Sequence, residues 1–155
     1  MRIQRQDERL TMFFTQDRNA LRQYFLQTWQ KAQNNEPLDQ LQMIIALVIE
    51  KHPEYHAFLQ KGDSALARDF SPEQGETNPF LHLGMHIGLH EQLSTNRPNG
   101  IVDVYRAMIK KRGDDHAAEH EMMECLGEIL WMSQRHNTIP DEQEYLRLLQ
   151  ERLQK

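Results

Sequence analysis

The sequence NPFLHLGMHIGLHEQLS fills residues 78–94 and predicts a single helix. Asn78 can cap the free N–H groups of a first turn, and Pro79 suits the first helical position. Apolar residues then recur at helical spacing. The segment that follows, STNRPNG at 94–100, is rich in turn residues, so the helix is expected to end near Ser94.

Helical spacing of apolar residues continues through most of the chain, and alternating strand patterns are absent. Residues 61–78 are polar and contain glycine and proline, so a long loop with one helical turn is expected there. The predicted fold is all-α, a single-domain bundle of about six helices over residues 1–155. The other predicted helices cover residues 15–33 with Thr15 as cap, 39–51, 53–59, 101–111, 114–135 and 140–153.

The composition argues against several kinds of partner. With 18 basic and 23 acidic residues the net charge is −5, which offers no positive field for nucleic acid or anionic lipid. No apolar run approaches the roughly 20 residues that span a bilayer. The single cysteine, Cys125, excludes a disulfide framework and a four-cysteine zinc site. The charged N-terminus, MRIQRQDERL, lacks the apolar region of a signal peptide, so a cytoplasmic location is expected.

Three histidines mark one face of the helix at 78–94. His82, His86 and His90 follow one another at four-residue spacing and fall within an arc of roughly 80°. Neighbours at this spacing can offer two nitrogens to one metal ion. The alternative is that they are hydrogen-bonded core histidines. Gly84 and Gly88 lie at the back of this helix, where another helix is expected to approach closely.

A second constellation lies in DDHAAEHEMME at residues 114–124. His116, Glu119 and His120 form the pattern H-x-x-E-H, in which two histidines bind zinc and the glutamate activates water. Glu119 falls on the buried stripe of its helix, where a carboxylate needs a cation or strong donors. Pairing with a buried arginine or with His86 is the alternative. Glu124, four positions after His120, is a further candidate ligand.

The ligand spacing narrows the type of metal site. No histidine has a glutamate three positions before it, which weakens a ferritin-like di-iron interpretation. Mixed histidine and carboxylate ligands suit zinc, iron or manganese. His52 is expected to cap a helix end, and the spacing leaves open whether His52 and His56 join the site.

Longer runs carry a family resemblance. The segments HPEYH at 52–56, NPFLHLGMHIGLHEQ at 78–92, RPNGI at 97–101 and HAAEHEMMECLGEILW at 116–131 resemble a bacterial family known as domain of unknown function 1841. The likeness extends without gaps from Phe13 and Phe14 to PDEQEYL at 140–146. It implies a cytoplasmic bacterial protein and no particular activity or catalytic residue.

Two functional hypotheses follow. The first is a helical metal-binding protein that holds one divalent ion (zinc, iron or manganese) between two helices; if it is an enzyme, metal-dependent hydrolysis or non-haem metal chemistry is expected. The second is a structural or protein-interaction module, with an unknown protein partner, whose histidines form a buried hydrogen-bond network. No nucleotide or organic cofactor, nucleic acid or membrane is indicated, and the oligomeric state is left open. The candidate metal ligands are His82, His86, His116, His120, Glu124 and His90, with Glu119 as the catalytic candidate.

Overall fold

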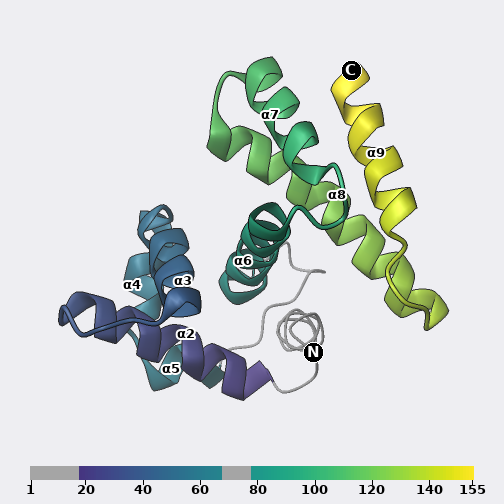
Figure 1. Cartoon of the computed structure of the whole chain (residues 1–155). Coiled ribbons are helices and arrows are strands. Elements are labelled where there is room, and N and C mark those ends of the chain that lie inside the picture. The colour runs from purple at the N-terminus through teal and green to yellow at the C-terminus, as the bar shows by residue number, and fades with distance from the viewer. Residues whose placement is uncertain (1–17, 68–77) are drawn as a thin grey trace. The chain divides into compact units, whose positions relative to one another are not determined.

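The computed structural model describes residues 18–67 and 78–155 (Figure 1). In these ranges it contains eight α-helices, one short 3₁₀ helix and no strand, which confirms the predicted all-α class. The predicted count of about six is too low: seven of the eight α-helices match predicted segments, and the eighth, α5 (Asp63–Ala67), forms within the predicted loop. The 53–59 segment divides into the 3₁₀ helix and a short α-helix. Thr15 lies outside the described residues, as does much of the predicted loop.

The chain divides into two compact units, Met1–Ile87 and Gly88–Lys155, and each is described by itself. The helix that carries the three histidines, α6, contributes its first part to one unit and its second part to the other. The prediction of a single domain over 1–155 stays a prediction.

The first unit is built from short helices and the beginning of α6. Its core consists of buried aliphatic and aromatic side chains from each of its α-helices. Burial of these side chains is the main favourable term in folding a unit of this size. The elements are α2 (Arg18–Gln33), α3 (Gln40–Glu50), η1 (Pro53–Tyr55), α4 (His56–Leu59), α5 (Asp63–Ala67) and α6 (Pro79–Thr95).

Local signals explain where α3 and α6 begin. Asp39 caps α3 by accepting from the Gln42 N–H at 2.8 Å, while the Gln42 side chain accepts from the Asp39 N–H at 3.0 Å. This reciprocal pair satisfies N–H groups that the helix itself leaves without partners. Asn78 caps α6 by accepting from the N–H groups of Phe80 and Leu81. The predicted start of α6 is therefore confirmed.

Phe80 and Arg22 link α6 to α2 within the first unit. The rings of Phe80 and Phe25 stack with centroids 6.4 Å apart, and the Arg22 guanidinium lies 4.8 Å from the Phe80 centroid. The same arginine donates to the Leu66 carbonyl of α5 at 3.1 Å. A buried arginine with a carbonyl acceptor and an aromatic face therefore joins three elements.

The second unit contains three packed helices: α7 (Ile101–Arg112), α8 (Asp115–His136) and α9 (Glu142–Gln154). Gly113 ends α7 with a positive φ of 78°, and Asp114 caps α8 through the Ala117 N–H, as the sequence predicts. The last helix begins two residues later than predicted. Asp141, rather than Pro140, sets its start, because its carboxylate accepts from the first free N–H groups.

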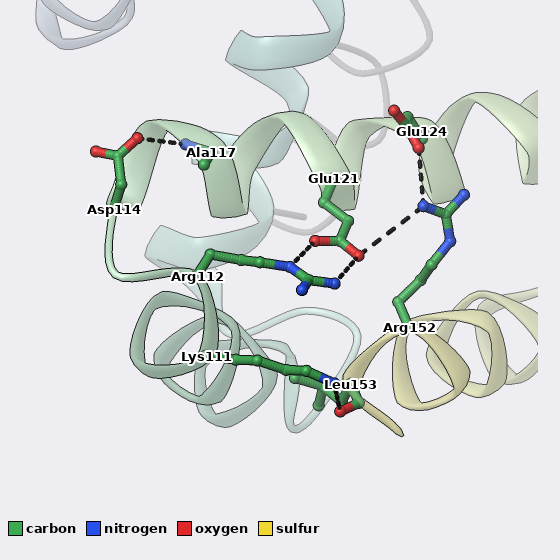
Figure 2. Close-up of polar contacts among 8 residues, drawn as sticks. All are labelled: Lys111, Arg112, Asp114, Ala117, Glu121, Glu124, Arg152 and Leu153. Carbon is green, nitrogen blue, oxygen red and sulfur yellow. Dashed lines mark hydrogen bonds and ion pairs between the residues drawn. The ribbon is translucent and has the colours of Figure 1, made fainter. Parts of the chain in front are cut away.

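Charged side chains join all three helices at one end of this unit (Figure 2). The Arg112 guanidinium meets Glu121 through two contacts of 2.5 and 2.7 Å. Arg152 of α9 lies 2.8 Å from Glu124 and 3.9 Å from Glu121. Lys111 donates to the Leu153 carbonyl. A two-contact arginine–carboxylate pair fixes the angle between groups as well as their distance, so Arg112 and Glu121 orient α7 against α8, while Arg152 adds single contacts from α9.

Candidate metal centre

Three histidines converge in the first unit. His52 follows α3, and His82 and His86 lie one turn apart on α6. Each offers a ring nitrogen, and these nitrogens lie within 4.8 Å of one another. His52 and His86 are each 1% exposed, and His82 is partly buried. The ring centroid of His52 lies 4.9 Å from the ring centroid of His82 and 4.9 Å from that of His86.

The backbone at the end of α3 orients the His52 ring. Its Nδ1 lies 2.7 Å from the Val48 carbonyl oxygen, which can only accept, so Nδ1 carries a proton. In the neutral ring the lone pair is then on Nε2, which lies 3.1 Å from Nε2 of His82. A ring N–H donated to a backbone carbonyl is the usual arrangement behind a metal-binding histidine. His52 thus caps the helix end, as predicted, and also presents Nε2 to its neighbour.

The spacing of the nitrogens is of the size that one ion requires. Metal–nitrogen bonds of about 2.0–2.1 Å place two ligand atoms about 2.9 Å apart at right angles and about 3.4 Å apart in a tetrahedron. The 3.1 Å between the His52 and His82 nitrogens lies between these values. The same distance also suits a hydrogen bond from one ring to the other.

His56 has a different role from His52. Its Nε2 lies 2.8 Å from the Ile49 carbonyl oxygen, and its ring packs on Trp29 with centroids 4.7 Å apart. It therefore holds the end of α3 against α2. Tyr55 stacks on His52, with the rings 5.5 Å apart and nearly parallel. Burial raises the pKa of the Tyr55 hydroxyl, and Glu54 adds to the effect, so this wall of the centre stays uncharged.

A second polar cluster surrounds Glu119 in the second unit. The Glu119 carboxylate is 1% exposed, which confirms its predicted place on the buried face of α8. Its Oε1 lies 3.0 Å from Nε2 of His90, and Tyr105 of α7 donates to its Oε2 at 3.2 Å. Burial raises the pKa of the Tyr105 hydroxyl, and the Glu119 charge raises it further, so Tyr105 remains a donor.

The other candidates on α8 are placed differently. His116 and His120 lie on one face with ring centroids 4.1 Å apart and are partly buried. Glu124 is 63% exposed and pairs with Arg152. Its carboxylate therefore belongs to the network of Figure 2. Metal binding by these three residues stays a prediction.

The sequence left open whether His52 joins the site, and it did not single out Tyr105. The position of His52 after the last turn of α3 indicated an end cap, and nothing in HPEYH shows that its second nitrogen faces α6, so the spacing could not decide whether it joins a site. Tyr105 lies 14 residues before Glu119, and its contact depends on how α7 packs against α8. A tyrosine among the inward-facing positions of a neighbouring helix was the only available signal.

Fold and site together define an all-helical protein with a buried histidine cluster. The chain belongs to the family described as Domain of unknown function (DUF1841), whose profile matches residues 17–151. No curated protein and no solved structure matches the chain. None of the described helices is both long and apolar enough to cross a membrane.

Proposed function

We propose that this protein binds one divalent metal ion through His52, His82 and His86. The observation that carries the proposal is the convergence of three ring nitrogens within 4.8 Å, two of them on side chains that are 1% exposed. Buried imidazoles need partners for both nitrogens, and a shared cation serves three rings at once. The Val48 carbonyl supports the proposal because it leaves the His52 Nε2 lone pair available.

The three imidazole ligands favour a transition-metal ion over calcium or magnesium. Neutral imidazole binds zinc, iron and copper well, whereas calcium and magnesium prefer oxygen. Zinc, iron or manganese remains the proposed set. The sequence-based proposals that His116, His120 and Glu124 add ligands, and that Glu119 acts as a base in hydrolysis or non-haem chemistry, stay predictions. We place this metal binding in the bacterial cytoplasm, which keeps a single cysteine such as Cys125 reduced.

The decisive experiment is elemental analysis of tag-free protein purified without chelators or a nickel column. We expect near-stoichiometric zinc, iron or manganese in the wild type and its loss in His52→Ala. His56→Ala is the matched control, because His56 lies four residues away and its ring nitrogen is held by the Ile49 carbonyl. A wild type that is folded, metal-free and unable to take up any of the three ions overturns the proposal. A His120→Ala variant tests whether α8 contributes a ligand.

A hydrogen-bond network is the second candidate, and the 3.1 Å distance between His52 and His82 supports it equally. In this case Val48 accepts from His52 Nδ1, and His52 Nε2 accepts from His82. The protein would then be a structural or interaction module with a protein partner still to be identified. Its expected signature is a metal-free wild type whose stability does not change when zinc, iron or manganese is added.

A further inference from the structure

We infer that the Glu119 cluster is a second metal position with its own ligands, His90 Nε2 and Glu119 Oε1, and that Tyr105 orients the carboxylate. These three residues lie in the second unit, and none of them is a proposed ligand of the three-histidine centre. Its favoured ligand is a divalent ion that accepts mixed nitrogen and oxygen donors in octahedral geometry, such as manganese or ferrous iron.

Glu119 places a carboxylate in the interior of the second unit. A carboxylate that is 1% exposed is costly unless cations or donors surround it. Tyr105 donates to Oε2 at 3.2 Å, and the other oxygen faces the His90 ring. Glu119 would thus bind through one oxygen while a hydroxyl holds the second. Ligating carboxylates are commonly hydrogen-bonded in this way, and the bond fixes their orientation.

The two proposed ligand atoms lie close together. His90 Nε2 and Glu119 Oε1 are 3.0 Å apart. Bonds of about 2.0–2.2 Å at right angles place adjacent ligand atoms about 2.8–3.1 Å apart, whereas a tetrahedral ion needs about 3.4 Å. The pair therefore fits neighbouring positions of an octahedral ion better than it fits tetrahedral zinc, and the same distance suits a hydrogen bond from His90 to Glu119.

Exposure and ligand type bear on how an ion would bind at this pair. The His90 side chain is 24% exposed, but its Nε2 and the Glu119 Oε1 are themselves buried, so an ion would enter the pair when the His90 side chain moves. Carboxylate oxygen favours manganese and magnesium, while imidazole favours iron and zinc. A site with one carboxylate oxygen and one imidazole nitrogen therefore favours manganese or ferrous iron. The all-nitrogen centre of the first unit lacks this oxygen donor, so the two positions should differ in preference.

The test is a manganese titration of the full-length protein after loading with one equivalent of zinc. Loss of the six-line spectrum of aqueous Mn²⁺ in electron paramagnetic resonance reports binding. We expect one bound Mn²⁺ in the wild type and at least about 100-fold weaker binding in Glu119→Gln. Tyr105→Phe keeps the ligands and should weaken binding by about 10–100-fold, as outer hydrogen-bond partners usually do. Glu124→Gln, an exposed carboxylate on the same helix, should bind as the wild type does.

Several results would overturn the inference. Zinc-loaded wild type that binds no Mn²⁺ or Fe²⁺ up to about 1 mM lacks the second position. Equal binding by wild type, Glu119→Gln and Tyr105→Phe removes these residues from it. If His52→Ala and Glu119→Gln each abolish the same single ion, the two clusters serve one ion and the second position does not exist. Manganese binding that depends on Glu119 but not on His52 supports the inference even if the three-histidine centre fails.

Discussion

The Nε2 atoms of His52 and His82 lie 3.1 Å apart, although 30 residues separate them in the chain. Two imidazole nitrogens at this distance must share either a proton or a cation, because two facing lone pairs repel each other. The Val48 carbonyl fixes the proton of His52 on the opposite nitrogen. The end of α3 and the first turns of α6 thus hold two histidine nitrogens at a distance that suits a shared proton or a shared metal ion.

Gly84 offers a test of how tightly α6 is packed. The sequence suggested close approach of another helix, but among the described residues a Cβ at Gly84 would have no neighbouring atom within 4 Å, so no described helix approaches this glycine as closely as expected. Alanine in a helix interior is more favourable than glycine by about 1 kcal/mol. We therefore expect Gly84→Ala to increase the free energy of unfolding by about that amount in urea denaturation.

Gly113→Ala is the contrasting variant, because Gly113 has a φ of 78° that alanine rarely adopts. We expect it to destabilise the protein by about 1 kcal/mol. A Gly84→Ala protein that is less stable than the wild type would show that α6 needs the space after all.

Arg22 should contribute strongly to the stability of the first unit. It is 3% exposed, donates to the Leu66 carbonyl and lies over the Phe80 ring. Arg22→Ala removes the charge-assisted hydrogen bond, the cation–π contact and the packing of the side-chain stem, so we expect a loss of about 2–4 kcal/mol. Arg106→Ala is the control, since its side chain is 76% exposed and should change stability by less than about 0.5 kcal/mol. Equal effects of the two substitutions would contradict this role for Arg22.

Element boundaries were largely predictable because local chemistry sets them. Two helices begin at a capping side chain, Asn78 or Asp114, and α7 ends at Gly113 in the left-handed conformation. Each of these residues acts within a few positions of its own place in the chain. The start of α9 was misjudged because a proline signal competed with the adjacent Asp141, whose carboxylate reaches two N–H groups.

The candidate sites were less predictable because they depend on tertiary contacts. The four-residue spacing of His82 and His86 places both rings on one face of α6, and this could be predicted from the sequence alone. The partner His52 comes from the end of α3, and no periodicity connects the two segments. The burial of Glu119 followed from the apolar stripe of α8, yet its contacts with His90 and Tyr105 required the packed structure.

Glu121 should make the second unit sensitive to acid. Its hydrogen bond with Arg112 holds the pKa of the Glu121 carboxyl below its usual range, and the charges of Arg112, Arg152 and Lys111 act in the same direction. A carboxyl whose pKa is lower in the folded state stabilises the protein above its unfolded pKa, about 4.3, and loses this contribution as the pH falls through the folded value.

The check is to compare wild type with Glu121→Gln by denaturant unfolding between about pH 7 and pH 3. We expect the wild type to be more stable at neutral pH and the difference to shrink toward acid pH. Because the network is partly exposed, salt should also reduce it. A difference that is constant over this pH range would exclude Glu121 ionisation as its source.

Cys125 should be unreactive in the native protein. It is 1% exposed, and burial raises the pKa of its thiol to about 11. At about pH 8 only about one thiol in a thousand would then be ionised, compared with about a quarter in the unfolded chain. We expect very slow reaction with a chromogenic disulfide reagent and rapid reaction in concentrated guanidinium chloride. Fast labelling of folded protein would show that the α8 surface around Cys125 opens readily.

Metal removal should weaken the first unit selectively. An ion that binds only the folded state stabilises it by about 2.7 kcal/mol when its concentration is 100 times the dissociation constant. Since His52, His82 and His86 join the end of α3 to α6, hydrogen exchange after chelation should accelerate in those segments. The amides of α9 serve as the internal reference, because that helix lies in the other unit. His52→Ala should exchange at the chelated rate with or without added metal. If chelation leaves exchange in α3 and α6 unchanged while the wild type demonstrably loses its ion, the ion does not bind at these histidines.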